Sequence, residues 1–189
     1  PGSSSVNGGS TASKLLLMKR VLLALLAGSL ILIAVSIAGV ANPPQAATVM
    51  LSIRELAGLS RLDERAGIAR YGAGPLPSPP YTIEAQMLPA GPAPVWGLWL
   101  GAAAAPVYIL LDNESYFSIG LNDWRPFLHL RSGLNRVYLH VDRSGNATLR
   151  LNGEIAWQGQ LIGSAPAEWG VALGAETYPT DFHLVLRAD

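Results

Sequence analysis

The feature that most constrains this chain is an apolar segment without a charged residue, which runs from Val21 to Ala41. Roughly 21 residues at a helical rise of about 1.5 Å each span roughly 31 Å, which matches the hydrocarbon core of a bilayer. Such a helix has no polar face, so it does not fit the surface of a soluble domain. We therefore expect a transmembrane helix over residues 14–41. The expected membrane-anchoring residues are Val21, Leu25, Ile31, Ile33 and Ile37.

Basic residues are distributed unequally around this segment. Lys14, Lys19 and Arg20 precede it, and the next basic residue is Arg54. The positive-inside rule then predicts a single-pass protein with a cytoplasmic N-terminus. Everything that follows the segment is expected on the periplasmic or extracellular side. The expected parts are a linker over residues 42–47 and a domain over residues 48–189.

A cleaved signal peptide is the alternative interpretation of the same segment. Gly39-Val40-Ala41 offers the small residues that signal peptidase prefers. A typical signal peptide has a shorter apolar core of about 7–15 residues, which favours the retained anchor. Both interpretations place the rest of the chain outside the cytoplasm. Residues 1–13 are rich in glycine and serine and are expected to be disordered.

Composition excludes several classes of function. The chain of 189 residues has 13 basic and 13 acidic residues and a formal net charge of zero. That balance gives no electrostatic basis for binding nucleic acid. There is no cysteine, which excludes disulfides, thiolate metal sites and cysteine nucleophiles. No motif in the sequence indicates a cofactor.

Short alternating runs dominate the chain after residue 80 and predict an all-β domain. Asn152-Gly153 between two such runs is a strong hairpin signal, because a type I′ turn needs positive φ at both central residues. Many short strands with turns every 8–12 residues indicate a sandwich or jelly roll. The expected strands are Tyr81–Met87, Val95–Leu100, Val107–Leu111, Tyr116–Leu121, Phe127–Leu130, Arg136–Asp142, Ala147–Leu151, Glu154–Gln158, Trp169–Leu173 and Phe182–Arg187.

Residues 45–80 are less regular. Ala47–Ile53 fits either a first strand or a helix, and the residues after it carry both periodicities. Ala66–Tyr71 reads as a short strand. Gly72–Pro80 contains four prolines and is expected to be a link rather than a helix or a central strand.

Several of these stretches resemble the concanavalin A-like lectin/glucanase superfamily, in its laminin-G-like and 3-keto-disaccharide-hydrolase-like bacterial branch. The resemblance covers roughly Thr48 to Asp189. It rests on YTIEAQMLPAGPAPVWGLWLG, VYILLDNESYFSIGLND, GLNRVYLHVDRSGNATLRLNGEIAW, WGVALGAE and FHLVLRA. Its most specific part is Asn135-Arg136-Val137 followed by Leu149–Glu154. The resemblance implies an antiparallel jelly-roll sandwich, but such a fold serves lectins, glycosidases, adhesion modules and spacers alike.

Catalysis is not expected. A glycosidase needs two carboxylates that flank the scissile bond, about 5–5.5 Å apart in retaining enzymes. The chain has no E-x-D-x-x-E run. Asp112 and Glu114 lie where turn residues would, and Glu84 is the only acid on its strand face. We therefore predict that the protein is not an enzyme.

Five tryptophans suggest a surface for a sugar or a protein partner. Trp96 and Trp99 are three residues apart, so in a strand they point to opposite faces of the sheet. The one that faces outward, assigned here as Trp99, is the first candidate for ligand contact, followed by Trp124 and Tyr116. The competing interpretation is that these side chains fill the core or cover an edge.

The sequence offers one candidate place for a metal ion. Asp112 and Asn113 offer oxygen ligands, and laminin-G-like domains often hold calcium with such residues. The alternative is a turn whose side chains cap their own backbone, because calcium prefers six to eight oxygen ligands. His129, His140 and His183 lack metal-ligand spacing and are expected to be structural or surface residues.

Two functions remain compatible with the sequence. The first is a non-catalytic accessory subunit, with its helix in the lipid bilayer among other membrane-protein subunits and its sandwich docked on their outer face. The alternative is a cell-surface carbohydrate-binding module, which the resemblance and the tryptophans suggest.

Overall fold

The computed structural model describes residues 18–29, 48–102, 104–161 and 168–188. The chain divides into two compact units, Pro1–Pro43 and Pro44–Asp189. In the first unit, residues 18–29 form a helix with exposed side chains. Within the described ranges, no helix is both long enough and apolar enough to cross a bilayer. The other parts of the predicted segment, together with residues 1–13 and 42–47, lie outside these ranges.

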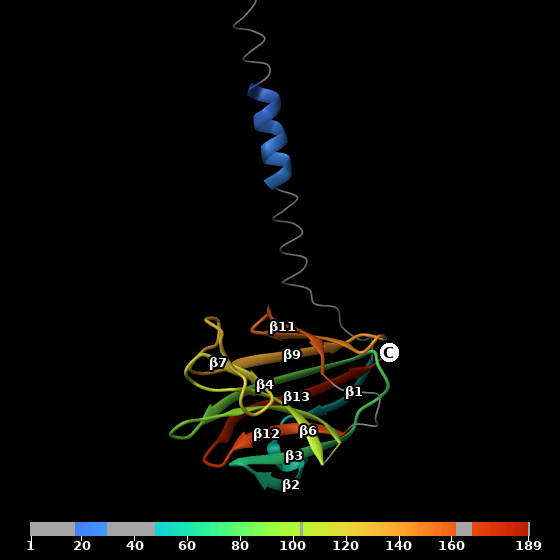
Figure 1. The fold of residues 1–189 in the computed structure, drawn as a ribbon, viewed down its shortest axis with the longest axis vertical. Helices are drawn as coiled ribbons and strands as arrows, with labels where there is room; N and C mark the ends of the chain where they lie inside the picture. The colour runs from blue at the N-terminus through green and yellow to red at the C-terminus, as the bar shows by residue number, and fades with distance from the viewer. Residues whose placement is uncertain (1–17, 30–47, 103, 162–167, 189) are drawn as a thin grey trace, which may run out of the picture. The chain divides into compact units, whose positions relative to one another are not determined.

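The second unit is an all-β sandwich of two antiparallel sheets (Figure 1), as the sequence predicts. One sheet has six strands in the order β1-β13-β4-β9-β10-β11, and the other has seven in the order β2-β3-β12-β5-β6-β7-β8. The 3-10 helix η1, Leu56–Gly58, joins β1 to β2. The strands are β1 Thr48–Ile53, β2 Ser60–Arg65, β3 Ile68–Pro75, β4 Tyr81–Ala90, β5 Trp96–Ala102, β6 Ala105–Leu111, β7 Tyr116–Ile119, β8 Trp124–Pro126, β9 Asn135–Val141, β10 Asn146–Leu151, β11 Glu154–Gln160, β12 Glu168–Gly174 and β13 Tyr178–Ala188.

The main hydrophobic core lies between the inner faces of the two sheets. Strand β4 shows how alternation produces it. Tyr81, Ile83, Ala85 and Met87 are buried in the core. Val137 and Leu139 of the neighbouring β9 lie opposite Ala85 and Ile83 and complete the same inner face. Because strand side chains alternate between faces, the pattern that predicts these strands also fixes their register.

The Asn152-Gly153 hairpin is confirmed, with φ of 53° at Asn152 and 95° at Gly153. A positive φ at both positions is what a type I′ turn requires. This turn joins β10 to β11. A second turn, between β9 and β10, places Gly145 at a φ of 82°.

Two expectations from the sequence are wrong, and one region that the sequence left open is resolved. Phe127–Leu130 forms a turn rather than a strand, and the strand there, β8, comes earlier. Of the two alternatives for Ala47–Ile53, the strand is correct and forms β1, and η1 and the hairpin β2–β3 follow it. Strand β3 continues to Pro75, which pairs with Glu168 of β12 at the end of the ladder. Proline is tolerated there because an end position does not need a complete set of backbone hydrogen bonds.

The edge strands are irregular. Three of the four edge strands contain one extra residue, which shifts the pairing register. These residues are Met50 of β1, Leu62 of β2 and Ala156 of β11. The fourth edge, β8, is three residues long and ends in Pro126. A bulge bends and twists an edge strand, so none of these four strands presents a long flat edge.

Candidate functional site

Trp96 and Trp99 point to opposite faces of β5, as the sequence predicts, but both are buried. Trp96 lies in the main core. Trp99 lies on the outer face of the seven-stranded sheet and is 0% exposed. The prediction that the outward-facing tryptophan offers an exposed ligand surface is therefore wrong for Trp99, because neighbouring side chains on the same face cover it.

A second hydrophobic cluster explains this burial. Its members on the outer face of the seven-stranded sheet are Ile68, Trp99, Tyr108, Leu110 and Ala172, with Val95 packed against them. The indole N–H of Trp99 donates a hydrogen bond of 3.0 Å to the carbonyl oxygen of Tyr71 on β3. To reach Tyr71 the ring passes over Gly170 of β12, where a Cβ would lie 2.8 Å from Trp99 Nε1.

Arg70 covers the ring of Trp99. Its guanidinium carbon lies 5.0 Å from the ring centroid, in cation–π geometry. The Arg70 side chain is itself only 2% exposed and donates two hydrogen bonds to the Asp63 carboxylate on β2, one of them 2.6 Å long. This hydrogen bonding lowers the pKa of Asp63 below its usual value and raises that of Arg70. Charge pairing therefore links the edge strand β2 to the Arg70 side chain that covers Trp99.

The other two predicted contact residues are brought together. Ser118 pairs with Trp124, and Tyr116 pairs with Pro126, so Tyr116 and Trp124 are diagonal neighbours on the same face of the β7–β8 hairpin. Tyr116 is 40% exposed and Trp124 is 37% exposed. Leu110 of the second cluster pairs with Ser118, which places this hairpin at the margin of the outer face of the seven-stranded sheet. We call Tyr116 and Trp124 the aromatic platform.

A turn before β7 holds Tyr116 in place. Asp112 Oδ1 accepts hydrogen bonds from the backbone N–H groups of Glu114 (2.9 Å) and Tyr116 (2.8 Å). The Asp112 backbone N–H also donates to the Tyr116 carbonyl oxygen. Asp112 thus caps its own turn, which was the alternative to calcium binding. Asn113, the other calcium candidate, is exposed in this turn, and within the described ranges no three His, Asp or Glu side chains form a metal-binding group.

A rigid turn follows the platform. The Phe127 N–H donates to the Ser115 carbonyl oxygen, and the Phe127 ring packs edge-on against Phe117. Asn135, which is buried, accepts a hydrogen bond from the Arg131 N–H and donates to the carbonyl oxygens of Arg131 and Gly133.

Asn152 completes this arrangement. Its side-chain amide donates to Asn135 Oδ1 at 2.8 Å and to the His129 carbonyl oxygen at 2.7 Å. Asn135 and Asn152, which belong to the most specific part of the resemblance, therefore act together as a clamp. Their hydrogen bonds fix residues 127–134. Sequence reasoning missed this role, although two asparagines at strand ends are a usable signal, since short amides often bind nearby backbone groups.

Glu84 and the three histidines contact neighbouring side chains. Glu84 forms an ion pair of 3.1 Å with Arg187 on the outer face of the six-stranded sheet. Three histidines make contacts with neighbouring side chains, namely His129 with Glu154, His140 with Thr82, and His183 with Ser52. The His129 ring also packs edge-on against the Phe127 ring, with centroids 5.7 Å apart.

Comparison with known proteins gives distant structural similarities. No protein-family model and no curated protein matches this sequence. BuGH16Bwt is similar at 8% identity and a TM-score of 0.48, covering 64% of each chain. This chain thus spans less than two thirds of the length of that protein.

Two further similarities are to proteins whose names refer to carbohydrate. The carbohydrate recognition domain of Emp47p is 12% identical with a TM-score of 0.46, covering 79% of this chain and 92% of that domain. The carbohydrate-binding module CBM66 from Bacillus subtilis is 8% identical with a TM-score of 0.47, covering 77% and 97%. At this distance no function transfers from them to this chain.

Proposed function

We propose that the β-sandwich binds carbohydrate without altering it, and that the aromatic platform is the contact surface. The single observation that carries this proposal is the geometry of Tyr116 and Trp124, two exposed aromatic side chains on one face of the β7–β8 hairpin. The alternative function derived from the sequence, a carbohydrate-binding module, is thus favoured over the accessory subunit.

The chemistry of the platform suits a sugar. Aromatic rings carry partial negative charge on their faces, and they make favourable contacts with the polarised C–H groups on one side of a sugar ring. The phenol hydroxyl of Tyr116 and the indole N–H of Trp124 add polar groups for sugar hydroxyls. The turn formed by Asp112 and the clamp formed by Asn135 hold the flanking backbone in place. Such preorganisation reduces the entropy lost on binding.

Binding is favoured over hydrolysis by the positions of the nearby carboxylates. Asp112 Oδ1 is engaged by two backbone N–H groups. Asp123 pairs with Arg125, whose hydrogen bonding lowers the pKa of the Asp123 carboxyl. A general acid requires the opposite, a carboxyl whose pKa is raised so that it holds a proton near neutral pH.

We also propose, from the sequence alone, that this domain is tethered at a membrane by residues 14–41 with the sandwich outside the cytoplasm. The uncharged segment Val21–Ala41 and the basic residues before it support this location. Alkaline carbonate extraction of full-length protein tests it. Recovery of the uncleaved chain in the aqueous fraction would contradict the tether. The accessory-subunit role remains a prediction, to be tested by looking for stoichiometric partners after purification in mild detergent.

A glycan array followed by titration tests the proposed binding. The full chain in mild detergent should bind at least one glycan, and Trp124→Ala should weaken that binding about tenfold or more, which corresponds to about 1.4 kcal/mol. Tyr178→Ala is the matched control, because Tyr178 is a 59% exposed aromatic residue on β13 in the six-stranded sheet. Equal losses in the two variants would refute the platform, and no binding to any glycan would refute the function.

A further inference from the structure

Most side chains along two rows on the outer face of the seven-stranded sheet are buried by one another. Arg70, Ala172, Gly97, Leu110, Ser118 and Trp124 follow one another across six neighbouring strands, from β3 to β8. The first five are buried, and only the last is exposed. The adjacent row contains Gly170, Trp99 and Tyr108, which are buried as well. Among the residues named in these two rows, only Trp124 on β8 is exposed to solvent.

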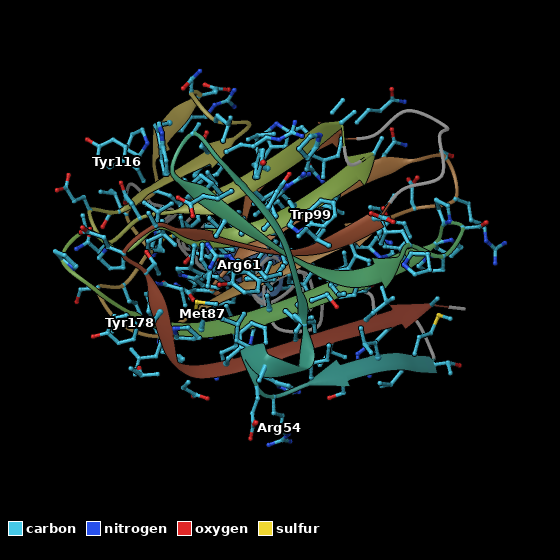
Figure 2. All side chains as sticks on the ribbon, turned by 90° about the horizontal axis from the view of Figure 1, so that it is seen from below. Arg54, Arg61, Met87, Trp99, Tyr116 and Tyr178 are labelled. Carbon is cyan, nitrogen blue, oxygen red and sulfur yellow. The ribbon has the colours of Figure 1, made fainter. Side chains whose placement is uncertain are left out.

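These buried side chains are closely packed and are therefore held in place by the fold. A Cβ at Gly97 would lie 1.8 Å from the Ile109 carbonyl oxygen, and one at Gly170 would lie 1.8 Å from the Tyr71 carbonyl oxygen. The Trp99 ring over Gly170 is held by its hydrogen bond to Tyr71 and by Arg70, which is joined to Asp63 of β2. Figure 2 shows Trp99 in the middle of this side of the molecule and Tyr116 at the margin.

Along these two rows, a ligand on the platform therefore meets no open groove that leads across the sheet. From Trp124 to Ser118, which lies directly opposite on the next strand, the side chains change from exposed to fully buried. Neighbouring strands are separated by about 4.8 Å, so along this row the exposed surface ends within the width of one strand. The contact area is limited to the margin formed by β7 and β8.

We infer that the site recognises a short glycan element of about two adjacent sugar rings, one for each aromatic ring of the platform, rather than an extended chain lying across the sheet. This inference rests on the proposed carbohydrate binding and specifies its ligand. Each additional sugar ring in contact would add binding free energy, whereas a ring that projects into solvent adds none. Beyond two or three sugars, affinity should thus increase only through the larger number of positions at which the longer chain can bind.

Isothermal titration with four oligosaccharide series tests this limit. The probes are the cello-, malto-, chito- and inulin-type oligosaccharides, from disaccharide to hexasaccharide, added to the full chain in mild detergent. A hexasaccharide offers five adjacent ring pairs and a trisaccharide two, so multiple registers alone raise affinity about 2.5-fold. In any series that binds, an increase below threefold from trisaccharide to hexasaccharide supports the inference, and a larger increase overturns it. Absence of binding in all four series and on the glycan array would instead refute the proposed function itself.

Tyr108→Phe provides a second, independent measurement. Tyr108 lies beside Trp99 on the filled part of the face and is buried. Removing its hydroxyl should leave the affinity for the hexasaccharide unchanged, because the sugar does not reach this residue. A fivefold loss with unchanged thermal stability would show that the chain extends across the sheet, and would overturn the inference.

Discussion

Adding a single methyl group at Gly170 should disrupt the packing of Trp99. The Cβ of an alanine at this position would lie 1.8 Å from the Tyr71 carbonyl oxygen and 2.8 Å from Trp99 Nε1. Neither neighbour can move freely, because the first is backbone of β3 and the second belongs to a buried ring. Gly170→Ala should therefore separate β12 from β3 locally and break the hydrogen bond from Trp99 to Tyr71.

The expected cost combines two effects. Overpacking of a dense region costs about 1–3 kcal/mol, and loss of the hydrogen bond adds about 1 kcal/mol. The free energy of unfolding should thus fall by about 2–4 kcal/mol. For a domain of this size the melting temperature should fall by roughly 5–15 °C.

Gly72→Ala is the matched control, because Gly72 lies directly opposite Gly170 in the same pair of strands. The three atoms nearest to a Cβ there all belong to the Leu62 side chain, the closest at 3.1 Å, and Leu62 is exposed and able to move. Its effect should stay within about 1 kcal/mol. Urea unfolding followed by tryptophan fluorescence measures both variants. Equal stability of the two would refute the view that Trp99 is locked over Gly170.

Three further predictions concern charge, burial and the asparagine clamp. The hydrogen bond from Arg70 lowers the pKa of Asp63 in the folded state. The ionised Asp63 therefore stabilises the fold at pH values above its unfolded pKa of about 3.9, and this stabilisation is lost as the pH falls through the lower pKa of the folded state. Thermal unfolding from pH 7 to pH 2.5 should show Asp63→Asn less stable than the unmodified chain at pH 7, with the difference shrinking in acid; a constant difference would contradict the assignment. Burial raises the pKa of Tyr81 to about 12, so stability should decline as the pH rises above about 10, and Tyr81→Phe should make that decline shallower in alkaline unfolding measurements. Asn135→Ala should cost about 2–4 kcal/mol, because it leaves polar groups of residues 131–133 and Asn152 without their partner; hydrogen exchange should show faster exchange of the Arg131 amide, and unchanged exchange would argue against the clamp.

The sequence predicts the parts of this fold that depend on local pattern. Alternation in Tyr81–Met87 gives both the strand and its buried face, and Asn152-Gly153 gives the hairpin, because each depends on residues next to one another in the chain. The opposite orientations of Trp96 and Trp99 follow in the same way from their spacing.

The burial of Trp99 depends on residues that are distant in sequence. Arg70 packs on one side of the Trp99 ring, and Gly170 leaves room for the ring on β12. These contacts follow from the strand order β3-β12-β5. The glycines at 97 and 170 inside apolar strands are the signal that could have indicated it, since glycine in a strand often marks a close approach of other atoms. The sequence predicts a strand over Phe127–Leu130, but the hydrogen bonds of Asn135 and Asn152 favour a turn.

The irregular borders of the two sheets have a consequence for how the protein tolerates crowding. Fibril growth needs a straight, unobstructed strand onto which an identical strand from another molecule can add. Here the extra residues Met50, Leu62 and Ala156 interrupt three borders, and Pro126 ends the fourth. A domain without cysteine has no cross-link to prevent transient opening, so these interruptions protect it against templated aggregation when many copies share a small volume.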